Sequence, residues 1–400
     1  MLTLLGLNLA CNARQPLIMM RRLAFLFLAL AALVAAAPAQ ARAQSVFRNV
    51  QRIVVFGDLH GEADKFEDML RVAGLVDANG NWAGGQTHFV QIGDVEDRGP
   101  DSRTILNHLM RLEPQARRAG GYVHALIGNH EAMNMLGDLR YTSSGEFASY
   151  ASRGAARLRD NYYLQTIAYE RAHPPASGLP VFDDAYRADW NTRHPLGYVE
   201  QRIAWAPNGV YGRWVASHDA MIVINDIVFM HGGIGPTFTE SNIDTINNAV
   251  RGALRGQPAA GFADILDNPD GPLWYRGFAL NSEASEAANV SAVLSRFHVA
   301  HIVVGHTKRT PTIAPRFGGG VILTDVAVPS GASDPHAFLE INNGQMTTIH
   351  RGQRIALDGS SDAARCAYLN QVAAADGAGG AVASLASRCD SLGAAATAAP

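Results

Sequence analysis

Residues 52–61 read RIVVFGDLHG, an apolar run that stops at a glycine and is followed at once by Asp58 and His60. A short β-branched and aromatic run of this kind predicts a buried strand over 52–56. The same arrangement returns at 88–94, HFVQIGD, where the apolar run again ends in Gly-Asp. Because loops at one edge of a packed sheet converge, we expect the polar side chains after these strands to face one site.

Three further segments repeat this order of strand, glycine and potential ligand. They are GNHE at 128–131, HGG at 231–233 and GHT at 305–307, each after an apolar run. A single Gly-Asp is more often an ordinary turn, and a single buried histidine is more often a hydrogen-bonded core residue. Five such segments in succession, each placed after a strand, instead indicate one shared site.

The segments between the first strands carry apolar residues at helical spacing, over 63–76 and 102–118. Alternation of strands and helices is typical of a layered α/β core. The strand pattern returns over 221–230, with a hairpin turn expected at Asn225-Asp226, and again over 301–304 and 321–326. The sequence therefore predicts an α/β fold.

Two stretches differ from this core in composition. Residues 138–217 are rich in Tyr, Arg and Trp and show no clear strand, and they are too long for a simple connection. We interpret them as an inserted helical cap. Residues 359–400 are dominated by Ala, Gly and Ser, which favours a weakly packed helical appendage. The catalytic domain is then expected over 44–358.

Residues 1–43 are interpreted as an N-terminal extension followed by a signal peptide for export. Arg21 and Arg22 precede the apolar run 23–37, and small residues then alternate up to Ala43. This is the order of a cleavable signal peptide, and the apolar run is shorter than the roughly 20 residues that a membrane span needs. We expect cleavage near Ala41 or Ala43, a periplasmic or secreted protein, and no stable membrane anchor afterwards.

Two cysteines, Cys366 and Cys389, lie in the expected mature chain. An even number of cysteines in an oxidising compartment favours a disulfide, with two unrelated thiols as the alternative. The whole chain is 48% hydrophobic and 17% charged, with 33 Lys and Arg against 36 Asp and Glu. This is a globular composition without a general basic field, so no nucleic-acid partner is expected.

The polar side chains after the strands form a typical set of metal ligands. Aspartate and asparagine oxygens together with histidine nitrogens suit borderline divalent ions such as Mn, Fe or Zn. Six ligands are too many for one tetrahedral ion with an open position, but they suit two ions that share a carboxylate. A zincin motif is excluded, because Asn134 stands where the second histidine would be. The predicted ligands are Asp58, His60, Asp94, Asn129, His231 and His306.

The ordered set GDLHG, GDVEDRG, GNHE, HGG and GHT resembles the calcineurin-like metallophosphoesterases, within their phosphoprotein-phosphatase group. GDLRY at 137–141 and GPLWYRG at 271–277 are similar to the Shewanella-like branch of that group. The resemblance covers roughly residues 50–330. It implies a four-layer α/β/β/α sandwich with an inserted helical cap and two divalent metal ions.

The resemblance also implies a role for each residue. Asp58 and His60 would hold the first metal, Asp94 would bridge both, and the other three ligands would hold the second. His130 would protonate the leaving oxygen, kept in its charged form by Asp97. Guanidinium and amide N–H groups donate hydrogen bonds to phosphate oxygens. The expected phosphate-binding residues are Arg98, Arg276 and Asn129. For Arg276 a structural role beside Trp274 and Tyr275 stays open.

The function implied is hydrolysis of phosphomonoesters by direct attack of a hydroxide that bridges the metals. Substrates would be phosphorylated peptides or proteins, phosphotyrosine favoured, or small phosphoesters, with Arg140 and Tyr141 at the pocket rim. One alternative is hydrolysis of a dinucleoside polyphosphate or a cyclic phosphodiester, which the same metal pair supports. Another is a non-catalytic phosphate-binding module, which predicts the loss of a ligand or of the acid, whereas all of them are present.

Overall fold

Two six-stranded β-sheets stack against each other in the structure, a computed structural model that describes residues 44–176, 178–326, 333–377 and 381–394. The first sheet has the order β12 (Gln353–Ala356), β11 (Gln345–His350), β10 (Phe338–Asn342), β2 (Arg52–Phe56), β3 (His88–Gln91) and β4 (Tyr122–Ala125). The second has the order β1 (Val46–Phe47), β5 (Met221–Ile224), β6 (Ile227–Met230), β7 (His301–Val304), β9 (Val321–Leu323) and β8 (Ala314–Arg316).

Parallel pairing places the ends of the key strands together. β2, β3 and β4 pair in parallel, so that Phe56 lies opposite Gln91 and Gln91 opposite Ala125. In the second sheet β6 and β7 are also parallel, with Met230 opposite Val304. The segments that follow these strands therefore leave each sheet at one edge, as the sequence predicts.

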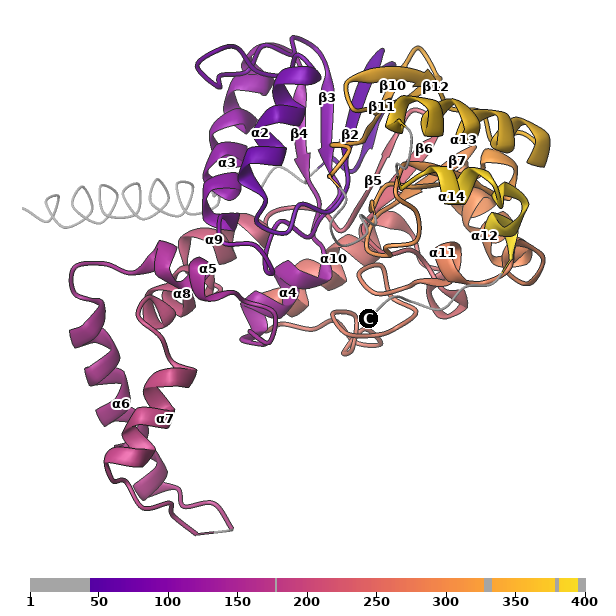
Figure 1. The fold of residues 1–400 in the computed structure, drawn as a ribbon. Helices are drawn as coiled ribbons and strands as arrows, with labels where there is room; N and C mark the ends of the chain where they lie inside the picture. Colours follow the sequence, from indigo (N-terminus) through magenta and orange to yellow (C-terminus); the bar gives the residue numbers. More distant parts are fainter. Residues whose placement is uncertain (1–43, 177, 327–332, 378–380, 395–400) are drawn as a thin grey trace, which may run out of the picture. The chain divides into compact units, whose positions relative to one another are not determined.

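Side-chain alternation along β2 divides the core into layers. Ile53 and Val55 point into the cluster between the sheets, while Val54 and Phe56 point to the outer face. Helices α2 (Ala63–Val72) and α3 (Ser102–Arg118) cover that outer face (Figure 1). Each fully buried aliphatic or aromatic side chain contributes about 1.5–3 kcal/mol to the free energy of unfolding.

Helices also cover the outer face of the second sheet. α10 (Ile243–Leu254) and α12 (Glu283–Phe297) bury residues of the same cluster that holds Met230 and Val304. Two central sheets flanked by helices confirm the predicted fold class. Short elements complete the layers, namely η1 (Pro236–Phe238), α11 (Gly277–Leu280) and η2 (Phe317–Gly319).

The regular elements in the described part of residues 138–217 are all helices. They are α5 (Ser144–Tyr150), α6 (Ala155–Ala172), α7 (Asp184–Arg193), α8 (Tyr198–Trp205) and α9 (Val210–Val215). Gln201 on α8 donates to Asn134 Oδ1 at 2.7 Å. Asn134 belongs to α4 (Asn129–Leu136), so this helical segment is tied to the helix on which the GNHE motif lies.

The C-terminal residues form a packed element, which we call the appendage: α13 (Asp362–Asp376), α14 (Ala383–Ala386) and η3 (Cys389–Gly393). Tyr368 and Leu369 are fully buried in a cluster with Ala314 of β8. The expectation of weak packing was therefore wrong, because apolar residues spaced along α13 pack against β8 and β12. A disulfide joins Cys366 of α13 to Cys389 of η3.

The expected leader lies outside the described residues. From Ser45 onward the chain forms one compact unit. Within the described ranges, no helix combines the length and the apolar character that crossing a membrane requires.

Candidate active site

The ends of five strands bring the predicted ligands together. Asp58 and His60 follow β2, Asp94 follows β3, Asn129 opens α4 after β4, and His231 and His306 follow β6 and β7. All six side chains are buried. Two groups of ligand atoms close enough to hold a cation form here, one of His60, Asp94 and His130 and one of Asp94, His231 and His306. Asp94 belongs to both groups. We call the six predicted ligands, Asp58, His60, Asp94, Asn129, His231 and His306, the metal centre.

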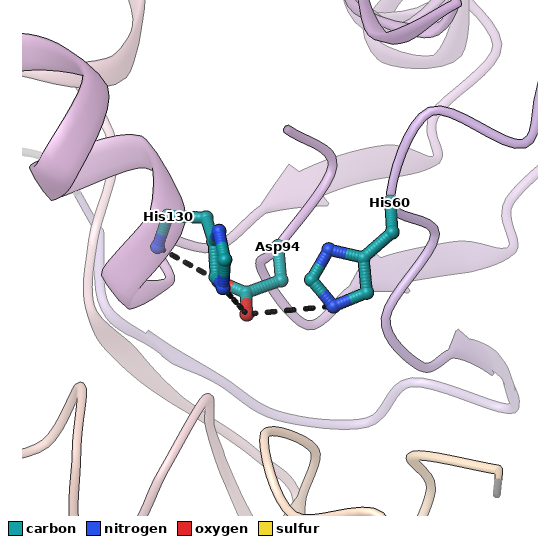
Figure 2. Close-up of side chains that lie close together, drawn as sticks. All are labelled: His60, Asp94 and His130. Atoms are coloured by element: carbon teal, nitrogen blue, oxygen red, sulfur yellow. Dashed lines mark hydrogen bonds and ion pairs between the residues drawn. The ribbon is translucent and has the colours of Figure 1, made fainter. Parts of the chain in front are cut away.

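The first group surrounds one carboxylate oxygen of Asp94 (Figure 2). Asp94 Oδ2 lies 3.9 Å from His60 Nε2 and 3.7 Å from His130 Nε2. Asp58 Oδ2 approaches the same His60 Nε2 to 3.8 Å. Asp58 is not a member of the compact group, but its free oxygen faces the same histidine nitrogen, which is consistent with its predicted role.

The second group surrounds His231 Nε2. This nitrogen lies 2.9 Å from Asn129 Oδ1, 3.2 Å from His306 Nδ1 and 3.2 Å from Asp94 Oδ1. A single N–H cannot serve three acceptors at once. Donor atoms bonded to one ion at about 2.1 Å are themselves about 3 Å apart, so these spacings fit a shared cation.

Backbone carbonyls fix the orientation of the three predicted histidine ligands. His60 Nδ1 is 2.9 Å from the carbonyl of Glu96, and His231 Nδ1 is 3.2 Å from that of Ile92. In His306 it is Nε2 that faces a carbonyl, that of Trp274, at 3.2 Å. Donation through one ring nitrogen leaves the other as a lone pair aimed at the centre, the usual arrangement around a protein-bound metal.

The charges of the residues present also fit divalent cations. Asp58 Oδ2 is buried without any hydrogen-bond partner, and burial raises the pKa of Asp58 well above its ordinary value, with the Asp325 carboxylate adding to the effect. Burial acts the same way on Asp94, but His231 and His130 hold its pKa well below normal. Burial disfavours a charged His231, yet Asp94 and Asp58 raise its pKa to about 9. Bound cations would neutralise these carboxylates and displace that proton.

The backbone at the centre is bent into an uncommon conformation. His60, Asp94 and His306 have φ values of 47°, 56° and 66°, in the left-handed region that non-glycine residues rarely adopt. Close packing explains the neighbouring glycine at 128: a Cβ there would lie 2.2 Å from Asp94 Oδ1. These residues adopt a less favourable backbone conformation, and that conformation directs their side chains into the site.

His130 and Asp97 form the predicted pair beside the centre. His130 Nδ1 lies 2.6 Å from Asp97 Oδ2, and Thr142 donates its hydroxyl to Asp97 Oδ1 at 2.7 Å. Burial disfavours a charged His130, but Asp94 and Asp97 together raise its pKa above the ordinary value. The ring of Tyr141 lies 5.2 Å from that of His130, so the start of the helical segment reaches the centre.

The two predicted phosphate-binding arginines differ in their surroundings. Arg98 is exposed, and its backbone N–H donates to the carbonyl of Tyr141. Arg276 is half-buried, and its Nη1 donates to the carbonyl of His306 at 2.9 Å and to Thr307 Oγ1 at 3.3 Å. Arg276 therefore lies directly at the metal centre, and one edge of its guanidinium is held by the segment that carries a ligand.

Two residues that the sequence reasoning did not single out also belong here. Asp325 is buried beside Asp58, and burial raises its pKa. It lies two residues after the end of β9, in the same position relative to a strand as the predicted ligands. Glu131 accepts the backbone N–H groups of Asp94, Val95 and Gly128 at 2.8–2.9 Å. The GNHE motif contained this glutamate, but its backbone partners are visible only in three dimensions.

Two helix-flanked sheets with a buried cluster of histidine, aspartate and asparagine side chains at the strand ends are typical of hydrolases that use two metal ions. The family model described as calcineurin-like phosphoesterase matches residues 51–309. The chain belongs to this family, as the sequence motifs predict. It is therefore a metal-dependent hydrolase of phosphoester bonds that uses divalent metal ions.

Relatives place the chain near one branch of the family. It is 31% identical to Shewanella-like protein phosphatase 2 of Arabidopsis thaliana over 73% of this chain and 75% of that protein. It is 25% identical to Shewanella-like protein phosphatase 1 of Plasmodium berghei over 64% of this chain and 61% of that one. The crystal structure of a cold-active protein-tyrosine phosphatase from a psychrophilic Shewanella species superposes with a TM-score of 0.59 at 28% identity, covering 78% and 82% of the two chains. The protein is a metal-dependent phosphatase.

Proposed function

We propose that the protein hydrolyses phosphomonoesters on phosphorylated peptides or proteins, with phosphotyrosine favoured. One observation carries the proposal: a paired histidine acid and an arginine both border a centre with ligands for two cations. The names of the relatives support a phosphoprotein substrate. Tyr141 beside His130 adds an aromatic surface next to the proton donor, where an aryl leaving group would lie.

The metal centre would hold the two cations through Asp58, His60, Asp94, Asn129, His231 and His306, with Asp94 shared. Mn, Fe or Zn suit this ligand set. When bound, two such ions act as Lewis acids on phosphoryl oxygens and make water nucleophilic near neutral pH.

The chain itself would orient the ester and move the proton. Arg276 and Arg98 would bind phosphoryl oxygens through charged N–H donors, together with the amide of Asn129. His130 Nε2 faces the centre while its Nδ1 is held by Asp97. A proton on Nε2 would pass to the departing oxygen, and Asp97 would stabilise the imidazolium before that transfer.

We propose that this reaction takes place in the periplasm or outside the cell. The leader-like residues 21–43 support export. The disulfide between Cys366 and Cys389 supports an oxidising compartment. Fractionation of cells that express the full chain, with the N-terminus of the mature protein sequenced, tests this proposal.

A substrate panel tests the proposed activity. The metal-loaded protein should release phosphate from phosphotyrosine and phosphoserine peptides, faster from the former, and turn over dinucleoside tetraphosphate and cyclic diesters far more slowly. Asp94→Asn should lose metal and lower kcat by about 10²-fold or more. Activity on the diesters alone, or an undiminished rate in Asp94→Asn, would overturn the proposal.

A further inference from the structure

Arg276 stands at the start of the one-turn helix α11. Its carbonyl accepts the N–H groups of Ala279 and Leu280 at 3.0 and 2.9 Å, which closes the turn, while its side chain reaches the carbonyl of His306. The carbonyls in the last turn of a helix have no partner within it. In a helix of four residues these carbonyl groups make up most of the backbone acceptors. The donors that bind them therefore fix the position of α11 and of Arg276.

Arg316 on β8 supplies those partners. Its side chain is fully buried, and it donates to the carbonyls of Ala279 at 2.9 Å and Asn281 at 2.8 Å. The same guanidinium donates through Nε to the carbonyl of Leu392 in the appendage at 2.9 Å. One buried cation thus joins the end of α11 to η3.

Arg309 makes the same connection a second time. It donates to the carbonyl of Ala279 in α11, and its Nη2 donates to the carbonyls of Leu392 and Ala394 at 2.9 and 2.7 Å. Cation donors at carbonyls of a helix C-terminus also complement its dipole. Two arginines therefore bind the same two segments of backbone.

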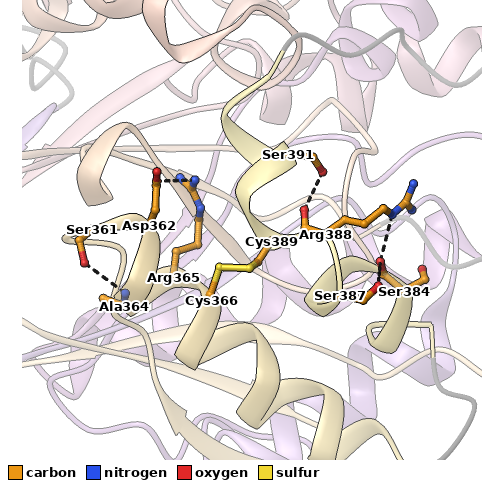
Figure 3. The surroundings of a disulfide bond; sticks show 10 residues. All are labelled: Ser361, Asp362, Ala364, Arg365, Cys366, Ser384, Ser387, Arg388, Cys389 and Ser391. Carbon is orange, nitrogen blue, oxygen red and sulfur yellow. Dashed lines mark hydrogen bonds and ion pairs between the residues drawn. A yellow bond between two sulfur atoms is a disulfide. The ribbon is translucent and has the colours of Figure 1, made fainter.

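The position of η3 depends on α13. The disulfide between Cys366 and Cys389 joins the first residue of η3 to the second turn of α13 (Figure 3). Arg365 on α13 is buried and binds Glu283 Oε1 at 3.1 Å, and that oxygen lies 3.6 Å from Arg316 Nε. The covalent link and the ion pairs hold the η3 carbonyls at the two arginines.

We propose that the appendage is a positioning element for the phosphate-binding arginine: through Arg316 and Arg309, the disulfide-held η3 fixes α11 and thereby Arg276. The proposal rests on the proposed role of Arg276. Removal of η3 from this network would leave buried guanidinium donors without acceptors, which is costly. The chain would then shift to satisfy them, and α11 would move with it. The family match ends at residue 309, so this element belongs to the part of the chain beyond the matched region.

The test compares the metal-loaded full chain with the double variant Cys366→Ser/Cys389→Ser. The probe is inorganic phosphate as a competitive inhibitor of p-nitrophenyl phosphate hydrolysis. We expect the inhibition constant and KM to rise by about fivefold and kcat to change by less than about twofold. Hydrogen exchange of residues 271–282 should become faster, while that of β3 should not change. Arg309→Lys, which keeps the charge but has fewer donors, should act in the same direction and does not rely on the disulfide.

Three comparisons make the result decisive. Arg276→Ala should raise the inhibition constant by about tenfold or more, and removal of the disulfide in that background should add nothing. Arg388→Met removes an appendage guanidinium whose Nε donates to the carbonyl of Ser384 within the appendage itself, and it should leave the inhibition constant unchanged. If Arg276→Ala has no effect, the proposed function of Arg276 fails. If Arg276→Ala raises the inhibition constant but the disulfide variant changes neither that constant nor the hydrogen exchange of residues 271–282, the positioning role alone is wrong. The same conclusion follows if the effects of Arg276→Ala and of disulfide removal on the inhibition constant multiply in the combined variant.

Discussion

The Nδ1 atom of His130 lies 2.6 Å from Oδ2 of Asp97, with both side chains almost entirely shielded from solvent. The other carboxylate oxygen of Asp97 accepts from Thr142, which belongs to the helical segment that the sequence inserts between β4 and β5. The orientation of His130, the proposed proton donor, is thus set jointly by the core loop after β3 and by the helical segment.

This pairing predicts a dependence on the leaving group. Asp97→Asn should lower kcat by about 10²-fold for phosphoserine peptides, whose alkoxide needs a proton to depart. The loss should be much smaller for p-nitrophenyl phosphate, because nitrophenolate leaves without one. Thr142→Val, which removes only the second contact to Asp97, should show the same trend more weakly. Equal losses on both substrates would show that Asp97 does not act through proton donation.

Removal of metal should destabilise the fold as well as stop turnover. Without cations, Asp58 Oδ2 is buried and has no hydrogen-bond partner, and Asp325 is buried beside it. Chelation should therefore lower Tm by about 5–10 °C, and added Mn or Zn should restore it. Asp58→Asn, which removes one charge, should show a smaller shift on chelation. The measurement is thermal unfolding with and without chelator, and a Tm that is indifferent to both treatments would contradict a structural contribution from metal.

Much of the site was predictable because it follows a repeated local rule. β2, β5, β6 and β7 begin and end where the apolar runs do, and α3 spans its predicted residues. Each ligand comes directly after such a run, so sequence position alone places it at the sheet edge. Asp325 obeys the same rule but has no recognisable motif around it.

The remainder of the fold depends on pairing between distant residues. The strands β10 to β12 were not predicted, since Glu340 interrupts the apolar pattern of β10. In the structure Glu340 is buried, and it is paired with Arg52 and Arg354. A charged residue becomes acceptable inside a strand only through partners 288 and 14 positions away. The fully buried Arg316 is hidden from sequence patterns for the same reason.

Glu146 on α5 should make stability depend on pH. Its side chain is fully buried, and burial raises its pKa to about 7 from 4.5. The folded state therefore holds a proton between pH 4.5 and 7 that the unfolded state releases. Stability should fall as pH rises through this window, by up to about 3 kcal/mol.

The variant Glu146→Gln isolates this effect. Glutamine keeps an acceptor for the N–H of Ser102 and cannot ionise. It should therefore stabilise the protein at pH 8 and have little effect near pH 4.5, as measured by urea unfolding at both values. Glu67→Gln, a change at a partly exposed carboxylate on α2 that pairs with Arg71 at the surface, should shift the free energy of unfolding by less than about 0.5 kcal/mol at either pH. A gain for Glu146→Gln that is the same at both pH values would rule out ionisation as the cause.

Tyr141 should favour aromatic substrates. Its side chain is 46% exposed, and its ring lies 5.2 Å from that of His130, so a phenyl ring bound next to the proton donor would pack against it. Aromatic pairs are worth about 0.5–1.5 kcal/mol beyond burial. Tyr141→Ala should therefore raise KM for phosphotyrosine peptides by about threefold to tenfold and leave KM for phosphoserine peptides nearly unchanged. Arg140→Ala is the matched control, since that exposed arginine pairs with Asp138 and should not alter the ratio. If Tyr141→Ala weakens both substrates equally, the ring contributes to the shape of the site rather than to the choice of substrate.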